Sequence, residues 1–158
     1  MSDNDMTALA ADASYVPAGP RVVQIEIEQD IARARREAKS MMEDIGFSSV
    51  AAMEVLIAVT ELATNLHVHA MPGGKVFLDE VQMEVQCGLI KGIEVISLDQ
   101  GPGIADIELA MQDRYSTIGS MGCGLPAVKR LMDEFELSSQ ADKGSNRSTR
   151  IVARKWQR

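Results

Sequence analysis

The chain has 158 residues, of which 46% are hydrophobic and 25% charged, and its formal net charge is −7. This length suits one domain with a full core, and the acidic balance excludes a nucleic-acid binder that works by neutralising phosphates. The 2 cysteines exclude a disulfide scaffold. No apolar run approaches the ~20 residues that span a bilayer, and the acidic N-terminus is unlike a signal peptide, so we expect a cytoplasmic protein without a membrane partner.

The chain begins with a small, acidic and aperiodic stretch, and we predict that residues 1–20 form a flexible tail. We expect residues 21–158 to form a single domain. Its first strand is predicted at 21–27, where polar and apolar residues partly alternate. A helix follows, with Asp30 as its predicted N-cap and Gly46 as the residue that ends it.

The next helix is expected to begin after Ser48 or Ser49 and to run to about Ala70. It is apolar on every side, which predicts a buried helix. Glu61 and Asn65 lie four residues apart in it and therefore share one face. Either this face is an edge that meets solvent, or it lines a wet cleft. In a cleft, Asn65 could give Mg²⁺ a neutral oxygen ligand and Glu61 could act as a base.

Strands at 75–86 and 92–98, with a turn at 88–91, predict a hairpin. The segment Asp99-Gln100-Gly101-Pro102-Gly103 follows directly and predicts a tight turn with exposed backbone. Asp99 accepts hydrogen bonds only when ionised, so it could bind the exocyclic amine of a purine. A plain turn is the alternative interpretation of this segment taken alone. A short amphipathic stretch at 106–113 comes next.

A second glycine-rich run, 119–124, leads into a helix predicted from Gly124 to Glu134. The free amides of a helix N-terminus favour an anion such as a phosphate. Two final strands are predicted at 135–140 and 147–156. The order strand, helix, helix, two strands, helix, two strands predicts an α+β protein, a two-layer sandwich with a mixed, mostly antiparallel sheet and helices on one face.

Three motifs in this order resemble those of the GHKL ATPase superfamily. Residues Glu61–Asn65 resemble its N box, Asp99–Gly103 its G1 box and Gly122–Leu125 its G2 box. More closely, the stretch Asp99–Glu136 resembles the small switch-type serine/threonine kinases of the RsbT kind, relatives of the anti-sigma factor kinases. The resemblance covers about Val22 to Trp156.

The resemblance implies a Bergerat-type ATP-binding fold and transfer of the γ-phosphoryl group of ATP to a Ser or Thr of a STAS-domain antagonist, in bacterial stress or sigma-factor signalling. Carried over by position, Glu61 would be the catalytic base, Asn65 would bind Mg²⁺ and Asp99 would contact adenine. The remaining nucleotide-binding residues implied in this way are Gly101, Gly103, Gly122, Cys123, Gly124 and Thr149.

A second function stays open, that of a catalytically weak, nucleotide-gated module that sequesters a partner, as an anti-sigma factor does. It is favoured by Val68, which stands where relatives tend to carry a lysine, and by Ser120 and Cys123 in the second glycine run. Glu61 and Asn65 favour the kinase. A downstream phosphatase, cyclase or sigma factor, and a second copy of the chain, are further partners that the resemblance leaves open.

Overall fold

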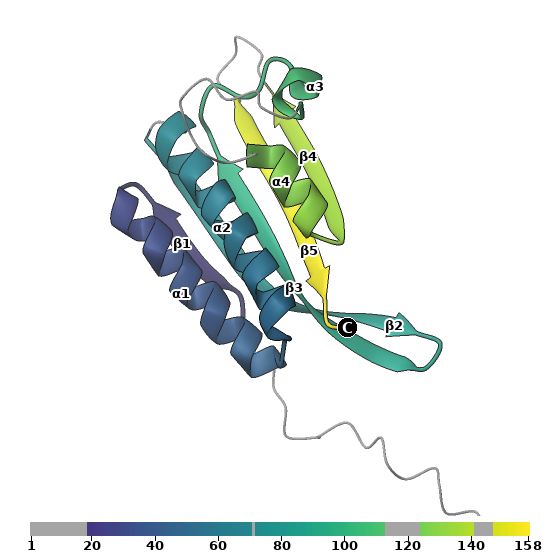
Figure 1. Cartoon of the computed structure of the whole chain (residues 1–158). Helices are drawn as coiled ribbons and strands as arrows, with labels where there is room; N and C mark the ends of the chain where they lie inside the picture. Colours follow the sequence, from purple (N-terminus) through teal and green to yellow (C-terminus); the bar gives the residue numbers. More distant parts are fainter. Residues whose placement is uncertain (1–18, 71, 113–123, 141–146) are drawn as a thin grey trace, which may run out of the picture.

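The computed structural model describes residues 19–70, 72–112, 124–140 and 147–158 (Figure 1). Almost all of the predicted tail therefore lies outside the described residues. The elements in chain order are β1 (Arg21–Ile25), α1 (Glu28–Ile45), α2 (Ser49–His69), β2 (Gly74–Val85), β3 (Gly88–Asp99), α3 (Ile107–Ala110), α4 (Gly124–Leu131), β4 (Glu134–Gln140) and β5 (Ser148–Trp156).

The strands form one sheet in the order β1-β2-β3-β5-β4, and each of its four pairings is antiparallel. Helices α1, α2 and α4 lie on the same face of this sheet (Figure 1). The predicted α+β sandwich is thus confirmed. Strand β5, the last strand among the described residues, lies inside the sheet between β3 and β4, so residues far apart in sequence meet at its ends.

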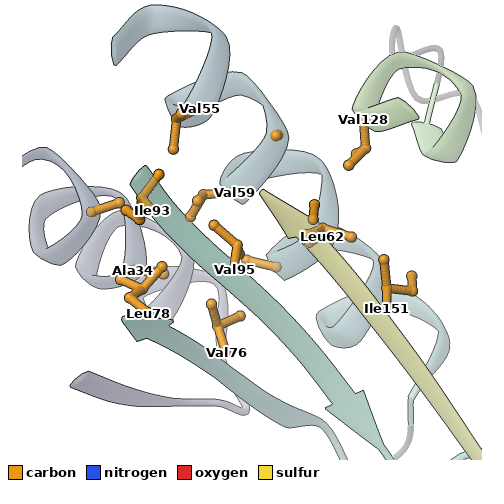
Figure 2. Packing of buried hydrophobic residues seen from close by; sticks show 14 of the residues in the cluster. Ala34, Val55, Val59, Leu62, Val76, Leu78, Ile93, Val95, Val128 and Ile151 are labelled. Carbon is orange, nitrogen blue, oxygen red and sulfur yellow. The ribbon is translucent and has the colours of Figure 1, made fainter. Parts of the chain in front are cut away.

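The hydrophobic core fills the space between α2 and the middle of the sheet. Val59 and Leu62 of α2 are fully buried against Val95 of β3 and Ile151 of β5 (Figure 2). Val128 joins the same cluster from α4. This packing fixes α2 across the sheet, and with it every polar residue that α2 carries.

Helix α1 begins at Glu28, so Asp30 is not its N-cap as the sequence suggested. Asp30 lies inside the first turn, where its carboxylate accepts hydrogen bonds from the backbone N–H groups of Glu26 and Ile27 at 2.9 and 3.1 Å. Asp30 therefore does cap the start of the helix, but its carboxylate acts from the third helical position and not from the N-cap position. These two bonds lower the pKa of Asp30. Gly46 ends the helix as predicted, at a φ of 87°.

The sequence predicted that this helix, α2, is buried on every side, but the structure shows that it is not. Ser48 caps it, with its Oγ accepting a hydrogen bond from the N–H of Ala51. One face packs on the sheet, but Val50, Met53 and Ile57 on another face are 69%, 55% and 40% exposed. By length and composition alone, this helix of 21 residues, with an 18-residue window of mean hydropathy 1.4, could cross a membrane, contrary to our expectation that no run approaches that length. In this fold α2 is a core helix with an apolar outer face.

The hairpin turn was also predicted in the wrong place. Strand β3 already starts at Gly88, which pairs with Val85, so the turn consists of Gln86 and Cys87 alone. Two-residue turns match the twist of the flanking strands, and Gly88 supplies a positive φ of 133° beside it. Helix α4 likewise stops at Leu131, before the predicted Glu134, because the N–H of Asp133 donates to the carbonyl of Arg154 in β5.

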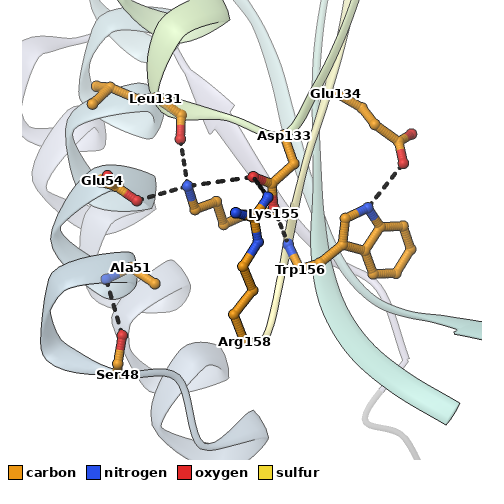
Figure 3. A network of polar contacts seen from close by, with 9 residues as sticks. All are labelled: Ser48, Ala51, Glu54, Leu131, Asp133, Glu134, Lys155, Trp156 and Arg158. Atoms are coloured by element: carbon orange, nitrogen blue, oxygen red, sulfur yellow. Dashed lines mark hydrogen bonds and ion pairs between the residues drawn. The ribbon is translucent and has the colours of Figure 1, made fainter. Parts of the chain in front are cut away.

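A polar network joins α2, the C-terminal end of α4 and β5 (Figure 3). The Nζ of Lys155 lies 2.6 Å from a carboxylate oxygen of Glu54 and donates to the carbonyl of Leu131 at 2.7 Å. Asp133 lies 3.6 Å from the same ammonium and accepts a hydrogen bond from the N–H of Trp156 at 2.8 Å. Lys155 is only 12% exposed in its side chain, so these partners replace most of its water.

Lys155→Met is expected to lower the free energy of unfolding by about 1–3 kcal/mol, because the Leu131 carbonyl and two carboxylates lose their shared cation. Urea denaturation measures this effect. Lys39→Met is the matched control, since the Lys39–Glu43 pair is 66% exposed on both sides and should contribute less than about 0.5 kcal/mol. Equal losses in the two variants would contradict a structural role for the network.

Candidate active site

Asp99 is the last residue of β3 and turns the chain away from the sheet. Its Oδ1 accepts a hydrogen bond from the N–H of Gly101 at 2.8 Å. Burial raises the pKa of the Asp99 carboxyl, and the Gly101 bond offsets part of that rise. A carboxylate at a strand end with one oxygen held by its own loop keeps its other oxygen for a partner.

The loop after Asp99 lies directly against the end of α2. A Cβ added to Gly101 would lie 3.1 Å from the Cα of Ala70 and 3.0 Å from Oδ1 of Asp99, so no side chain fits there without a shift. Gly103 has a φ of 75°, which favours glycine. Glycine is therefore required at the two positions of the predicted turn for different causes. Gly101 allows the loop to approach α2 closely, and Gly103 adopts a backbone conformation with a positive φ.

Thr149 lies next to Asp99 on the neighbouring strand, because the two residues are direct partners in the β3–β5 ladder. It is 6% exposed. Its hydroxyl oxygen lies 2.9 Å from the Oγ of Ser139 in β4, and Ser139 accepts a hydrogen bond from the N–H of Ile104 at 2.7 Å. Sequence reasoning missed Ser139, although its pairing with Thr149 would have been the signal that could find it.

Ser139→Ala is expected to cost about 1–3 kcal/mol of unfolding free energy, because the half-buried Ile104 amide is left without its acceptor. It should also loosen the loop that follows Gly103. Ser138→Ala is the control, since Ser138 is exposed and faces the other side of the same strand. Denaturation curves of both variants measure the difference, and a Ser139 variant as stable as the Ser138 variant would refute it.

Glu61 and Asn65 are both half-buried on α2. Because they are four residues apart, they share one side of the helix. Asn65 lies little more than one helical turn before Ala70, and Ala70 lies against Gly101. Burial raises the pKa of the Glu61 carboxyl. Helix α2 thus carries a carboxyl of raised pKa and an amide on one side, and its C-terminal end meets the loop that follows Asp99.

Gly124 begins α4 with a φ of 48°, and nothing lies within 4 Å of where its Cβ would be. The predicted helix start is therefore confirmed. Gly122 and Cys123 lie outside the described residues. Within the described ranges no group of three or more His, Cys, Asp or Glu side chains could hold a metal ion. An Mg²⁺ ion bound at Asn65 would accordingly need ligands from elsewhere, as it does when it bridges nucleotide phosphates.

Comparison with known protein families matches residues 25–153 to the histidine kinase-like ATPase domain. The chain belongs to this family. The matched segment of this ATPase domain includes Glu61, Asn65, Asp99 and Thr149, so the expected resemblance to GHKL ATPases is confirmed, and nucleotide use comes with the family.

Two relatives make the resemblance more specific. The chain is 41% identical to the serine/threonine-protein kinase RsbT of Bacillus subtilis over 136 residues, which cover 86% of this chain and 96% of RsbT. It is 33% identical to the anti-sigma F factor of Caldanaerobacter subterraneus over 105 residues, 64% of this chain and 71% of that factor. The predicted kinship with switch-type kinases and anti-sigma factors is thereby confirmed.

Solved structures agree on the fold. The mycobacterial sensor histidine kinase MprB superposes with a TM-score of 0.51 at 21% identity, covering 87% of this chain and 97% of that one. The SiaB–SiaC complex of Pseudomonas aeruginosa gives a chain with the same TM-score at 12% identity, covering 86% and 89%. At these identities the likeness concerns the ATPase fold.

Proposed function

We propose that this ATPase-domain protein is an ATP-dependent serine/threonine kinase and partner-switching regulator whose acceptor is a STAS-domain protein in bacterial stress or sigma-factor signalling. The kinase class follows from the similarity to RsbT over nearly the whole of both chains. The observation that carries the proposal within this chain is the shared face of Glu61 and Asn65 on a helix whose end touches the Asp99–Gly103 loop.

The chemistry assigns a separate task to each side chain. Asp99 accepts a hydrogen bond from the adenine amine. Thr149, its pairing partner on β5, lines the same adenine-binding end of the site. Asn65 would supply an oxygen ligand to Mg²⁺, and the amide of Gly124 at the start of α4 would bind phosphate. Gly122 and Cys123, which lie outside the described residues, are the further phosphate-binding residues that the resemblance implies. Gly101 and Gly103 shape the loop under the nucleotide.

Glu61 acts as the general base in this proposal. Its carboxylate accepts the proton of the acceptor hydroxyl as the oxygen attacks the γ-phosphorus, and the bond from the γ-phosphorus to the bridging oxygen of ADP breaks. Mg²⁺, when bound, neutralises charge on the phosphate oxygens. Positioning contributes most of the acceleration in such transfers, so the rigid seat of α2 on the sheet matters as much as the base itself.

The test is incubation of the chain with Mg²⁺, γ-labelled ATP and purified STAS-domain proteins of the same organism. Label on a Ser or Thr of one of them is the expected result. In parallel, Mg-ADP should raise the melting temperature of the chain, because a ligand that binds only the native state stabilises it. No thermal shift with either nucleotide would refute the proposal.

A second candidate function is a nucleotide-gated sequestering protein. It is supported by the likeness to anti-sigma F factors and by Val68, which is 39% exposed on the helix that carries Glu61 and brings no cation to the site. Nucleotide-dependent binding of a STAS protein or a sigma factor without label transfer would favour this function. Either role uses intracellular ATP, so we propose the cytoplasm as its location.

A further inference from the structure

The outer face of α2 carries an apolar stripe that no described part of the chain covers. We define it as Val50, Met53 and Ile57, which are 69%, 55% and 40% exposed. The other exposed large apolar side chains outside α2 occur singly, on β1, on β3, at the start of α1 and on α3: Val22, Leu89, Ile27 and Ile107. The most apolar 18-residue window of α2 has a mean hydropathy of 1.4, yet only 33% of that window is buried, so much apolar surface of the helix meets water.

The stripe leads along the helix to Glu61. At 3.6 residues per turn, Val50 and Ile57 lie within about 20° of one line, and Glu61 lies about 40° to one side of it, about 6 Å beyond Ile57. Glu54 lies on that same side, and its ion pair with Lys155 shows that the side faces β5. Glu61 therefore stands at the border between the solvent-facing stripe and the flank of α2 that faces β5 and α4.

We propose that the stripe is the surface on which the acceptor protein docks. This inference rests on the proposed function, since a base that removes a proton from a protein hydroxyl must be reached by a second protein from the solvent side. The stripe begins one turn from that base and extends about 10 Å away from it. It has no charged side chain, so the matching surface is a protein patch of apolar side chains beside the acceptor Ser or Thr.

The double variant Val50→Glu/Met53→Lys tests this without disturbing the helix. The new carboxylate and ammonium, three residues apart with the acid first, support a helix and leave the net charge unchanged. Both positions lie away from Glu61, so Mg-ADP should raise the melting temperature as in the wild type. With a STAS protein that the wild type labels, we expect KM for that protein to rise at least 10-fold and kcat at saturation to stay near the wild-type value.

Leu89→Lys is the matched control, because Leu89 is 63% exposed but lies at the tip of the β2–β3 hairpin. It should leave KM unchanged. Ile57→Gln should give a smaller rise in KM than the double variant, since Ile57 is less exposed. A double variant with wild-type KM would overturn the docking surface while label transfer by the wild type still upheld the kinase. Absence of label with the wild type would instead refute the kinase itself.

Two other occupants would give different results. If a second copy of the chain covers the stripe, light scattering shows a wild-type dimer that the double variant converts to a monomer, with KM for the acceptor unchanged. If a membrane does, the wild type sediments with phosphatidylglycerol vesicles and the double variant does not. Either result would overturn the assignment of the stripe to the acceptor protein.

Discussion

Replacing Glu61 with Gln is expected to lower the rate of phosphoryl transfer by about 10²- to 10⁴-fold, the usual contribution of a positioned general base. The amide keeps the size of the side chain but cannot accept the proton of the acceptor hydroxyl. Affinity for Mg-ADP should not change, because in the proposed mechanism Glu61 acts on the acceptor hydroxyl and does not bind the nucleotide. Single-turnover transfer of label to a STAS protein, with calorimetry of Mg-ADP binding, measures both quantities.

Glu54→Gln is the control for that experiment, since it makes the same change on the same side of α2 about two turns earlier. It weakens the Lys155 network and should lower stability but not the chemical rate. If Glu61→Gln transferred label as fast as the wild type, Glu61 would not be the base. Slow transfer in both variants would point to a general disturbance of α2.

The pH dependence of Glu61 adds an independent readout. Burial raises its pKa above the ordinary value of 4.5, so transfer should accelerate as pH rises through the raised pKa. The folded protein also holds this proton more tightly than the unfolded chain, so the free energy of unfolding falls as pH rises above 4.5. At neutral pH the nucleotide-free Glu61→Gln protein is therefore expected to melt at a higher temperature than the wild type, and at pH below 4.5 this advantage should vanish.

Replacing Asp99 with Asn is expected to weaken Mg-ADP binding by about 100-fold, because an acceptor for the adenine amine is lost and the new amide group presents a donor to it. The turn should survive, since the Asn side-chain oxygen can still accept the hydrogen bond from Gly101. Isothermal calorimetry measures the affinity. The thermal shift that Mg-ADP gives the wild type should shrink in parallel.

Asp106→Asn provides the comparison for this variant. Asp106 caps α3 by accepting from the N–H of Leu109 at 2.9 Å, a few residues beyond the Asp99 loop, and an asparagine caps a helix equally well. It should bind Mg-ADP as the wild type does. Wild-type affinity in Asp99→Asn would exclude Asp99 from recognition of the base and would leave the N box as the main support for a nucleotide site.

The order of elements and the position of each motif could be predicted from the sequence, because both depend on local patterns. Gly46 and Ser48 mark helix ends through their own backbone and side-chain preferences, and the structure confirms them. Asp30 shows the limit of such patterns. A capping carboxylate can act from the N-cap or from inside the first turn, and the residue type alone does not distinguish the two positions.

Features that depend on tertiary contacts could not be predicted from the sequence. Helix α2 is apolar on every side, yet which side meets solvent depends on where α1 and α4 pack, so its exposed stripe was not foreseen. Ser139 entered the candidate site only through its pairing with Thr149, because the sequence predicts the two consecutive strands but not which of their residues pair. For the glycine-rich run, only Gly124 lies among the described residues, and the roles of Gly122 and Cys123 stay predictions.

The place of β5 within the sheet has a consequence for how the protein folds. Residues of β5 must insert between β3 and β4 before Thr149 can lie beside Asp99, and this pairing joins segments about 50 residues apart in sequence. A folding intermediate in which β5 has not yet paired consequently lacks the Asp99–Thr149 pair that we propose to contact adenine, so nucleotide cannot stabilise that intermediate. Stabilisation by nucleotide is thereby restricted to molecules in which all five strands of the sheet have paired.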